Sequence, residues 1–226
     1  MKSEYGSDHS LERAMSSPCW GHRSGVRSVP VSARAYGFDA AYTGVPAWDI
    51  GRPQRTFVEL ADAGEIVDRV LDVGCGTGEL SLYLADRGND VLGIDFAPQA
   101  IRQAKEKAYW RQSPAQFLVW DALNLRDLPL RFETVTDSAH FHCLNDAERD
   151  RYVDGLHAVL NPGGRCFVLA AATPERWGRR PGGVAYSEFV DRFDDGWTVA
   201  WIRNAPFENR RYPYAHPAYL CKAVRQ

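Results

Sequence analysis

VLDVGCGTG, residues 70–78, is the stretch of this chain that decides its fold, because it predicts a buried strand, a glycine-rich turn and a helix in direct succession. Val70, Leu71 and Val73 are typical of a strand that is buried on both faces of a sheet. The glycines permit a tight turn and let the backbone approach a ligand closely, since they have no Cβ. The helix that begins near Thr77 directs free backbone N–H groups toward that ligand.

Two further apolar segments end in an acid. DVLGID, residues 90–95, predicts a second strand, and Asp95 follows the glycines by about twenty residues, the spacing of an acid that binds ribose hydroxyls. FLVWDA, residues 117–122, predicts a third strand, after which Asp121 could accept a hydrogen bond from an adenine amino group. A helix cap or a solvated turn residue is the alternative for Asp121. The combined pattern predicts a site for an adenosine-containing cofactor.

The spacing of the glycines argues against a dinucleotide. A dinucleotide site has the pattern G-x-G-x-x-G, whereas here the third glycine comes one residue early and Glu79 occupies its expected position. Asp72 adds a carboxylate at the strand end, which would repel a pyrophosphate but attract a ligand with an ammonium and a sulfonium group. The simpler alternative is an ordinary strand-to-helix turn of an α/β domain.

Together these motifs resemble those of the class I S-adenosylmethionine-dependent methyltransferases, over roughly residues 69–168. The resemblance is carried by LDVGCGTG at 71–78, GID at 93–95, WDA at 120–122 and LNPGG at 160–164. The alternation of strands and helices predicts an α/β fold with a doubly wound, Rossmann-like and mostly parallel sheet. The resemblance implies seven strands in a single domain, with the last strand antiparallel to the others.

The resemblance also implies which residues bind S-adenosylmethionine. Its methionine portion would be held by Asp72, Gly74, Gly76 and Gly78, its ribose by Asp95, and its adenine by Asp121 with Ala122. Further cofactor contacts are expected from Trp48, Gly51, Phe96 and Asp137. Ala97 departs from the family pattern, which often has a Ser or Thr there to cap the next helix, and the loss of such a cap costs about 1 kcal/mol.

The segment YTGVPAWDIGRPQ, residues 42–54, resembles the W-x-x-G-x-P-Q segment of small-molecule methyltransferases in the thiopurine, thiol and halide group. It is also similar to actinobacterial enzymes that methylate heterocyclic phenols and quinolones. In those proteins the segment folds over the cofactor, and its tryptophan, here Trp48, walls the active site. Tyr36 and Gln54 are further candidates for acceptor contacts. The alternative is that Trp48 only packs the N-terminal segment onto the sheet.

DSAHFH, residues 137–142, follows the fourth predicted strand, where a doubly wound sheet has its ligand cleft. We expect His142 to act as a general base, His140 to substitute for it or anchor the acceptor, and Phe141 to contact the acceptor. The alternative is a histidine that satisfies backbone groups under the cleft. A base is dispensable if alignment of the nucleophile with the methyl carbon supplies most of the acceleration. Two histidines without a third donor do not indicate a metal.

The composition excludes several classes of function. The chain has 226 residues, 45% of them hydrophobic, and a formal charge of −2, so it has no basic excess for binding nucleic acid and no apolar run that approaches a membrane span. Its five scattered cysteines predict neither disulfides nor a zinc site. The N-terminus lacks the apolar centre of a signal peptide, so a cytoplasmic location is expected. The oligomeric state, monomer or homodimer, stays open.

The chain is expected to consist of a flexible or loosely packed arm, residues 1–35, and a methyltransferase domain, residues 36–226. Residues 1–35 are polar, rich in Ser and Arg and without periodicity. The domain ends with a helix near 187–193 and two strands, 198–202 and 219–224. Between the fifth strand and that helix, Trp177 and Arg180 are expected on a flap over the acceptor.

These features predict S-adenosylmethionine-dependent methylation of O, S or N in a small aromatic or heterocyclic metabolite, in natural-product biosynthesis or detoxification. An aromatic wall formed by residues such as Trp48 and Trp177 favours a flat acceptor. The alternatives are a methyltransferase for thiols or halides and a protein that binds the cofactor without turnover. Protein methylation stays open, whereas nucleic-acid methylation is disfavoured because no N-P-P-Y or D-P-P-Y follows the fourth strand.

Overall fold

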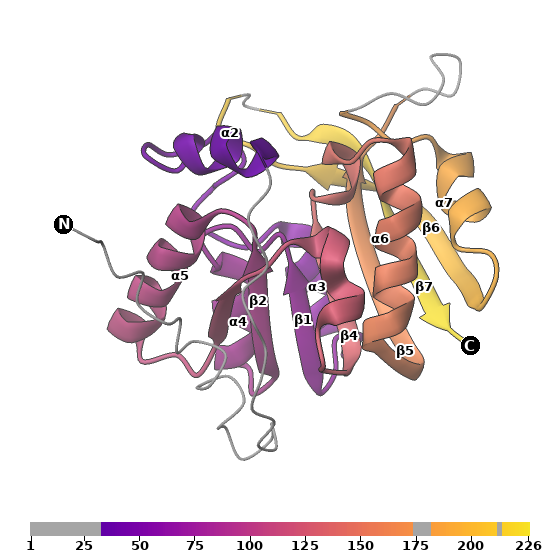
Figure 1. The fold of residues 1–226 in the computed structure, drawn as a ribbon, viewed down its shortest axis with the longest axis horizontal. Helices are drawn as coiled ribbons and strands as arrows, with labels where there is room; N and C mark the ends of the chain where they lie inside the picture. Colours follow the sequence, from indigo (N-terminus) through magenta and orange to yellow (C-terminus); the bar gives the residue numbers. More distant parts are fainter. Residues whose placement is uncertain (1–32, 174–181, 212–213) are drawn as a thin grey trace.

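A seven-stranded mixed sheet forms the centre of the molecule in the computed structural model, which describes residues 33–173, 182–211 and 214–226 (Figure 1). The strand order is β3-β2-β1-β4-β5-β7-β6. The strands are β1 (Arg69–Val73), β2 (Asp90–Asp95), β3 (Gln116–Val119), β4 (Phe132–Ser138), β5 (Leu160–Ala171), β6 (Trp197–Phe207) and β7 (His216–Arg225). Strands β1 to β5 pair in parallel, and β7 is antiparallel to both β5 and β6. The predicted fold class, including the antiparallel last strand, is confirmed.

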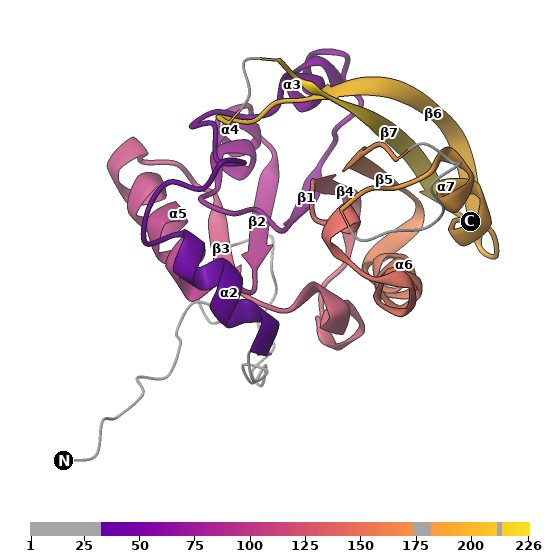
Figure 2. The ribbon, with the colours of Figure 1, turned by 90° about the horizontal axis from the view of Figure 1, so that it is seen from above.

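Helices cover both faces of this sheet, as expected of a doubly wound fold (Figures 1 and 2). They are α2 (Ala33–Ala41), α3 (Arg55–Asp62), α4 (Glu79–Asp86), α5 (Pro98–Arg111), α6 (Asp146–Val159) and α7 (Tyr186–Arg192), with short 3-10 helices η1 (Ala122–Asp127) and η2 (Phe141–Cys143). Val70 of β1 packs into the core with α3, α4 and α5, whereas its neighbour Leu71 packs into the core with α6 and α7. The apolar run of residues 70–73 is therefore buried on both faces, as its sequence predicts.

The register of the parallel strands brings three acids to one edge of the sheet. Val73 is paired with Ile94 of β2 on one side and with Asp137 of β4 on the other. Asp95 ends β2 and is paired with Val119. Asp137 is therefore level with Val73, and Asp72 and Asp95 each lie one residue from that level along their strands. This is the edge at which the predicted ligand cleft should open.

The predicted secondary structure is mostly confirmed, with differences at the ends of elements. Asn145 forms a capping box with Glu148 at the start of α6, the pattern of an Asn followed three residues later by a Glu. Strand β5 begins at Leu160, directly after α6, and its pairing with β4 shifts register after Phe132. The late strands β6 and β7 are longer than predicted because they pair with each other along almost their whole length.

Helix α2 replaces the cap that Ala97 lacks. Ala97 precedes α5 and makes no side-chain cap, but Gln99 in the first turn of α5 donates its backbone N–H to Asp39 of α2 (2.7 Å). Figure 2 shows α2 beside α5. A helix N-terminus attracts a carboxylate from any part of the chain, so the cap comes from a segment about sixty residues away. Residues 1–32 of the predicted arm lie outside the described residues.

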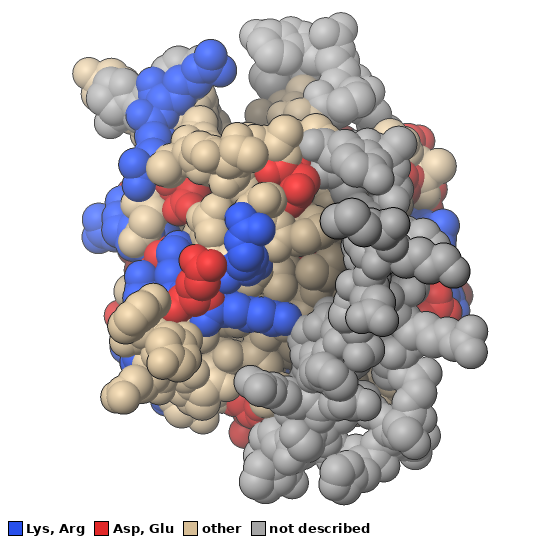
Figure 3. Space-filling model, turned by 60° about the vertical axis from the view of Figure 1, so that its left-hand side comes forward, with Lys and Arg blue, Asp and Glu red and all other residues tan. Residues whose placement is uncertain are grey.

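The described surface carries mixed charge, and no described helix is both long and apolar enough to cross a membrane. On the face that Figure 3 shows, basic and acidic side chains are interspersed. Lys107 and Arg111 of α5, for example, both pair with Glu79 at the start of α4 (2.7 and 2.9 Å). These pairs join the helices that flank the glycine turn.

We expect Gly78→Ala to destabilise the fold more than Gly88→Ala, because only Gly78 lacks room for a methyl group. Both glycines have a positive φ, +83° for Gly78 and +95° for Gly88. A Cβ at Gly78 would lie 2.7 Å from Phe117 and 3.0 Å from Ala104, whereas a Cβ at Gly88 would meet nothing within 4 Å. Gly88→Ala should cost about 1–2 kcal/mol of backbone strain, and Gly78→Ala about 1–3 kcal/mol more.

Urea unfolding of the two variants without cofactor measures this difference. Equal losses of unfolding free energy would show that the contact between α4 and Phe117 of β3 does not require a glycine.

Candidate active site

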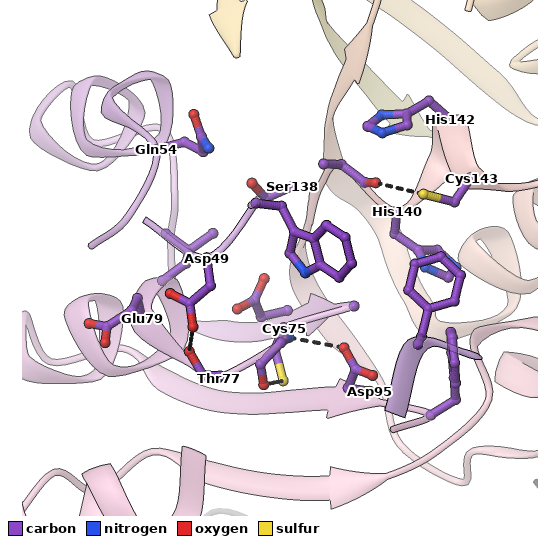
Figure 4. A pocket seen from close by; sticks show the side chains of 18 of the residues that line it. Asp49, Gln54, Cys75, Thr77, Glu79, Asp95, Ser138, His140, His142 and Cys143 are labelled. Atoms are coloured by element: carbon purple, nitrogen blue, oxygen red, sulfur yellow. Dashed lines mark hydrogen bonds between the residues drawn. The ribbon is translucent and has the colours of Figure 1, made fainter. Parts of the chain in front are cut away.

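A cavity of about 910 Å³ opens at the carboxyl ends of β1, β2 and β4 (Figure 4). Its volume lies in the range of sites for small molecules, about 300–1,000 Å³. It is bounded by the glycine turn after β1, the end of β2, the segment from α2 to α3, the loop after β4 and the end of β6. Of the predicted site residues, the cavity is lined by Trp48, Gln54, Asp72, Gly74, Gly76, Asp95, Phe96, Asp121, His140 and His142.

The glycine turn forms the floor of the cavity. A Cβ at Gly74 would lie 2.9 Å from the Cβ of His140, so glycine allows the loop after β4 to lie directly against the turn. Gly76 donates its backbone N–H to Asp95 (3.0 Å). Gly78 does not line the cavity, because it faces Phe117 and packs α4 against the sheet. Gly78 was predicted to contact the cofactor, but in this structure it allows α4 to pack closely against Phe117 of the sheet.

Two buried carboxylates point into the same cavity. Asp72 accepts hydrogen bonds from the hydroxyls of Ser81 (2.6 Å) and Thr136 (2.9 Å), and burial raises its pKa to about 6. Asp95 accepts the backbone N–H groups of Gly76 and Ala97 (3.0 and 2.9 Å), and burial raises its pKa to about 6. A carboxylate oxygen has two lone pairs, so both side chains retain capacity for further donors.

The third acid, Asp137, was predicted to contact the cofactor but lies outside the cavity. Its Oδ1 accepts the backbone N–H groups of His140 (2.8 Å) and Phe141 (3.3 Å), and its Oδ2 accepts the hydroxyl of Tyr152 (2.8 Å). It is fully buried, and burial raises its pKa to about 7. Asp137 thus holds the turn after β4 in place.

Phe141 was predicted to contact the acceptor, but it lies in the core. Its ring is fully buried and stacks on Phe189 of α7 with a centroid distance of 5.7 Å. The 3-10 turn that Asp137 fixes directs residue 141 inward, while its neighbours His140 and His142 line the cavity.

At the predicted adenine end of the cavity, Asp121 is a lining residue as expected, but Ala122 is not. Asp121 lines the cavity and accepts the backbone N–H of Leu123 (2.9 Å), which caps η1. Ala122 is buried and does not line the cavity, whereas Leu123 and Asn124 do. Because Asp121 caps η1, Ala122 faces the core, and the side chain of Leu123 lines the cavity in its place.

The roof of the cavity is an aromatic cluster from α2 and the segment after it. Trp48 donates its indole N–H to the hydroxyl of Tyr42 (3.1 Å), and its ring lies 5.8 Å from that of Phe38. Phe38 also contacts the predicted cofactor residue Phe96 edge-on (5.5 Å). Phe38 and Tyr42 line the cavity and were not singled out from the sequence; aromatic residues just before the W-x-x-G segment were the available signal. The side chain of Tyr36 lies outside the described residues.

Other residues of this segment hold it in position. Gln54 lines the cavity, but its amide exchanges two hydrogen bonds with the backbone of Glu208 (2.8 and 2.9 Å). Asp49 accepts the hydroxyl of Thr77 (2.8 Å) and the backbone N–H of Gly51 (3.0 Å). Gly51 itself does not line the cavity. The bonds of Gln54 and Asp49 tie the segment to the end of β6 and to the glycine turn, and the predicted cofactor contact of Gly51 is not found in the cavity lining, whereas Gln54 remains a candidate for acceptor contact.

Figure 4 shows His142 on the side of the cavity away from Asp95, with His140 between the two and against Gly74 of the glycine turn. The His142 Nδ1 accepts the backbone N–H of Ala171 (3.2 Å), and the edge of the Phe207 ring is 5.9 Å away. Burial, and then the charge of Arg149, lowers the pKa of His142 to about 4. His142 is neutral at physiological pH, and a group with so low a pKa is a weak base.

Trp177 and Arg180 lie outside the described residues. Among the described residues, no group of three His, Cys, Asp or Glu side chains is arranged to hold a metal ion.

A sheet of this strand order, with a glycine turn after β1 and a buried acid at the end of β2 on one cavity, defines a class I S-adenosylmethionine-dependent methyltransferase. A protein-family model described as a methyltransferase domain matches residues 70–164. A 2-heptyl-1-hydroxyquinolin-4(1H)-one methyltransferase of Mycobacteroides abscessus is 36% identical over 159 residues, which are 68% of this chain and 69% of that protein. The chain belongs to this methyltransferase family. It is an enzyme that methylates small molecules, with S-adenosylmethionine as its cofactor.

Other relatives share parts of the chain. A probable thiol methyltransferase of Arabidopsis thaliana is 25% identical over 154 residues, 65% of this chain and 66% of that protein. A solved structure from work on the conversion of a disulfide bond into a thioacetal group during echinomycin biosynthesis superposes with a TM-score of 0.77 and 32% identity. That superposition covers 85% of this chain and 91% of the other.

Replacing Asp137 with Asn should stabilise the protein at high pH. The folded-state pKa near 7 lies far above the value of about 3.9 for an unperturbed Asp, so between these values the folded protein holds a proton that the unfolded chain has lost. Wild-type stability therefore falls as the pH rises through about 7. Asn keeps an oxygen for the two backbone N–H groups without the buried charge. We expect Asp137→Asn to be more stable than wild type by about 1–3 kcal/mol at about pH 8, with the difference shrinking toward about pH 4.

Unfolding free energies across this pH range provide the measurement. Asp154→Asn, at an exposed position, is the control and should show no such trend. A constant destabilisation of Asp137→Asn at every pH would mean that the ionised carboxylate stabilises the loop.

Proposed function

We propose that this enzyme transfers the methyl group to an O, S or N atom of a small aromatic or heterocyclic metabolite. The observation that carries the proposal is the continuity of one cavity from Asp95 and Gly76, at the cofactor end, to His142 and Phe207. A single continuous space would bring an acceptor beside the cofactor. Its aromatic roof, with Trp48 and Phe38, supports a flat acceptor.

The residues at the cofactor end fit S-adenosylmethionine. Asp95 is a buried carboxylate held by two backbone amides, and its remaining lone pairs would bind ribose hydroxyls. Asp72 supplies a second buried carboxylate, with the sign required beside a cationic methionine portion. S-adenosylmethionine provides an electrophilic methyl group on a sulfonium, and its loss to a nucleophile leaves neutral S-adenosylhomocysteine.

The residues at the other end would orient the acceptor and exclude water. Leu144, Ala139 and Phe207 provide apolar surface there, and Ser138 and His142 provide polar groups. Enclosure favours a reaction in which charge disperses, and fixed alignment of the nucleophile with the methyl carbon supplies much of the rate acceleration. This end therefore acts mainly by positioning.

The relatives support the same class of acceptor. The Mycobacteroides abscessus protein acts on a hydroxyquinolinone, which is a planar nitrogen heterocycle with an alkyl chain. The echinomycin-related structure supports a place in natural-product biosynthesis. The Arabidopsis relative supports a second candidate, the methylation of a thiol, for which the same cavity would hold a softer nucleophile.

A screen of hydroxyquinolinones, phenols, thiols and azoles tests the proposal, with release of S-adenosylhomocysteine as the measurement. We expect turnover of hydroxylated heteroaromatic compounds. Turnover of aliphatic thiols alone would favour the second candidate, and turnover of none of these classes by protein that binds the cofactor would contradict the proposal.

Asp72→Asn should weaken the binding of S-adenosylmethionine about tenfold or more, and that of S-adenosylhomocysteine less. The hydroxyls of Ser81 and Thr136 can turn to accept from the new amide, so the local structure is kept while the charge beside the sulfonium is lost. Because ligand binding favours the ionised carboxylate, wild-type affinity should also fall as the pH drops through about 6.

Titration calorimetry with both ligands measures these differences. Equal losses for S-adenosylmethionine and S-adenosylhomocysteine would instead indicate that Asp72 acts on the ammonium group, which both ligands carry, and not on the sulfonium.

A further inference from the structure

The end of β5 leaves a backbone donor that β4 does not satisfy. β4 ends at Ser138, which pairs with Leu169, and Ala139 donates the next bond to the Leu169 carbonyl. The chain then turns away, so the N–H of Ala171 has no strand carbonyl opposite it. His142 supplies the missing acceptor through Nδ1 at 3.2 Å. Ala171 is only partly buried, so this bond contributes about 0.5–1.5 kcal/mol, the range of an ordinary hydrogen bond.

This hydrogen bond fixes both the orientation and the tautomer of the ring. If the imidazole were flipped, a carbon atom would face the Ala171 N–H. With Nδ1 as the acceptor, the neutral ring carries its proton on Nε2. The group that His142 can offer to the cavity is therefore an N–H donor, and Figure 4 shows its ring directed toward the open space.

The backbone of His142 is anchored as firmly as its ring. Its carbonyl accepts the N–H of Gly182 (2.9 Å) and lies 3.5 Å from the Arg149 guanidinium. Arg149 also donates to the carbonyl of Gly183 (2.9 Å) and forms a buried ion pair with Glu188 (2.6 Å). The loop after β4, the segment at 182–183 and α7 are thus joined at one buried guanidinium. A donor held in this way keeps its direction when an acceptor binds.

The charged and titratable groups packed around His142 do not favour its protonation. Arg149 of α6 lies behind it and opposes a positive charge on the ring, and Glu188 of α7 is engaged by Arg149. His140 and Cys143 of its own loop line the cavity beside it. Phe207 of β6 adds an apolar neighbour. Burial and the charge of Arg149 both keep His142 neutral.

We propose that His142 binds the acceptor as a hydrogen-bond donor, through Nε2–H, and selects acceptors that enter the site already ionised, with a negatively charged oxygen at this donor. The proposal rests on the proposed function and specifies its substrate class: hydroxylated heteroaromatic or phenolic compounds that ionise near neutral pH. The acceptor O–H loses its proton to solvent. An electron pair of that oxygen then forms the bond to the methyl carbon, and the electron pair of the broken C–S bond stays on sulfur. No protein base takes part.

The tautomer of His142 is tested without any acceptor, by NMR of protein labelled with nitrogen-15 in histidine. We expect Nδ1 to be unprotonated, Nε2 to carry the proton, and neither to titrate between about pH 5.5 and about pH 9. The spectrum of His142→Gln assigns the signals. A proton on Nδ1, or a titration between about pH 6 and about pH 7.5, would overturn the proposal, and this result is independent of whether the acceptor screen succeeds.

The donor role is tested by comparing His142→Gln with His142→Ala on an acceptor from the screen. The Gln amide can accept from Ala171 and donate to the acceptor, but it cannot take up a proton. We expect His142→Gln to keep kcat/KM within about fivefold of wild type and His142→Ala to lose about 10–100-fold, because one hydrogen bond to a charged group is removed.

The loss in His142→Ala should be larger for acceptors of higher pKa, and thermal unfolding without ligand controls for damage to the loop. Equal impairment of the Gln and Ala variants, with a new requirement for high pH in both, would show that His142 removes the proton and would overturn the proposal.

Discussion

Burial of carboxylates at the carboxyl ends of parallel strands is the constraint on which the rest of this site depends. The register that pairs Val73 with Ile94 and with Asp137 brings three acids to one edge of the sheet. Desolvation penalises each charge, so each acid must find donors. Asp72 takes two hydroxyls and Asp95 two backbone amides, and both keep lone pairs for a ligand. Both carboxylate oxygens of Asp137 accept hydrogen bonds within the protein, one from the loop after β4 and one from Tyr152 of α6. The same residue type thus lines the cavity at two positions and holds the loop after β4 in place at the third.

The sequence predicted the fold because the fold depends on local patterns, and the same patterns identified Gly74, Gly76 and Asp95, which line the cavity. Strand, glycine turn and helix are contiguous in residues 70–78, and Asp95 follows at a fixed spacing. The acceptor end depends on contacts between distant segments. The bonds of Gln54 go to Glu208, 154 residues away, and the tautomer of His142 is set by Ala171. Phe141 turns inward because of a 3-10 turn whose direction no pattern in DSAHFH reveals.

The roof over the cofactor end is secured by polar bonds as well as by aromatic packing. Asp49 accepts from Thr77 in the glycine turn, and Lys107 of α5 donates to the same hydroxyl (2.6 Å). At the other side, Arg52 pairs with Glu208 at the end of β6 (2.7 Å). The segment between α2 and α3 is therefore tied to both halves of the sheet. Because these ties are polar and partly exposed, breaking them costs only a modest free energy.

The charge distribution of the cavity follows from the reaction it would host. Transfer of a methyl group from a sulfonium to an anion removes the charge of the acceptor, so strong stabilisation of that anion before the reaction would raise the barrier. A cation in contact with the acceptor would hold the anion too firmly. The buried Arg149 contacts the His142 backbone and is paired with Glu188, and it does not line the cavity. Among the arginines that line it, Arg52 is paired with Glu208 and Arg151 donates to Asn124. A neutral imidazole N–H stabilises the bound anion only moderately, and the donor stays aligned with the acceptor oxygen. The oxygen therefore keeps enough nucleophilicity to attack the methyl carbon.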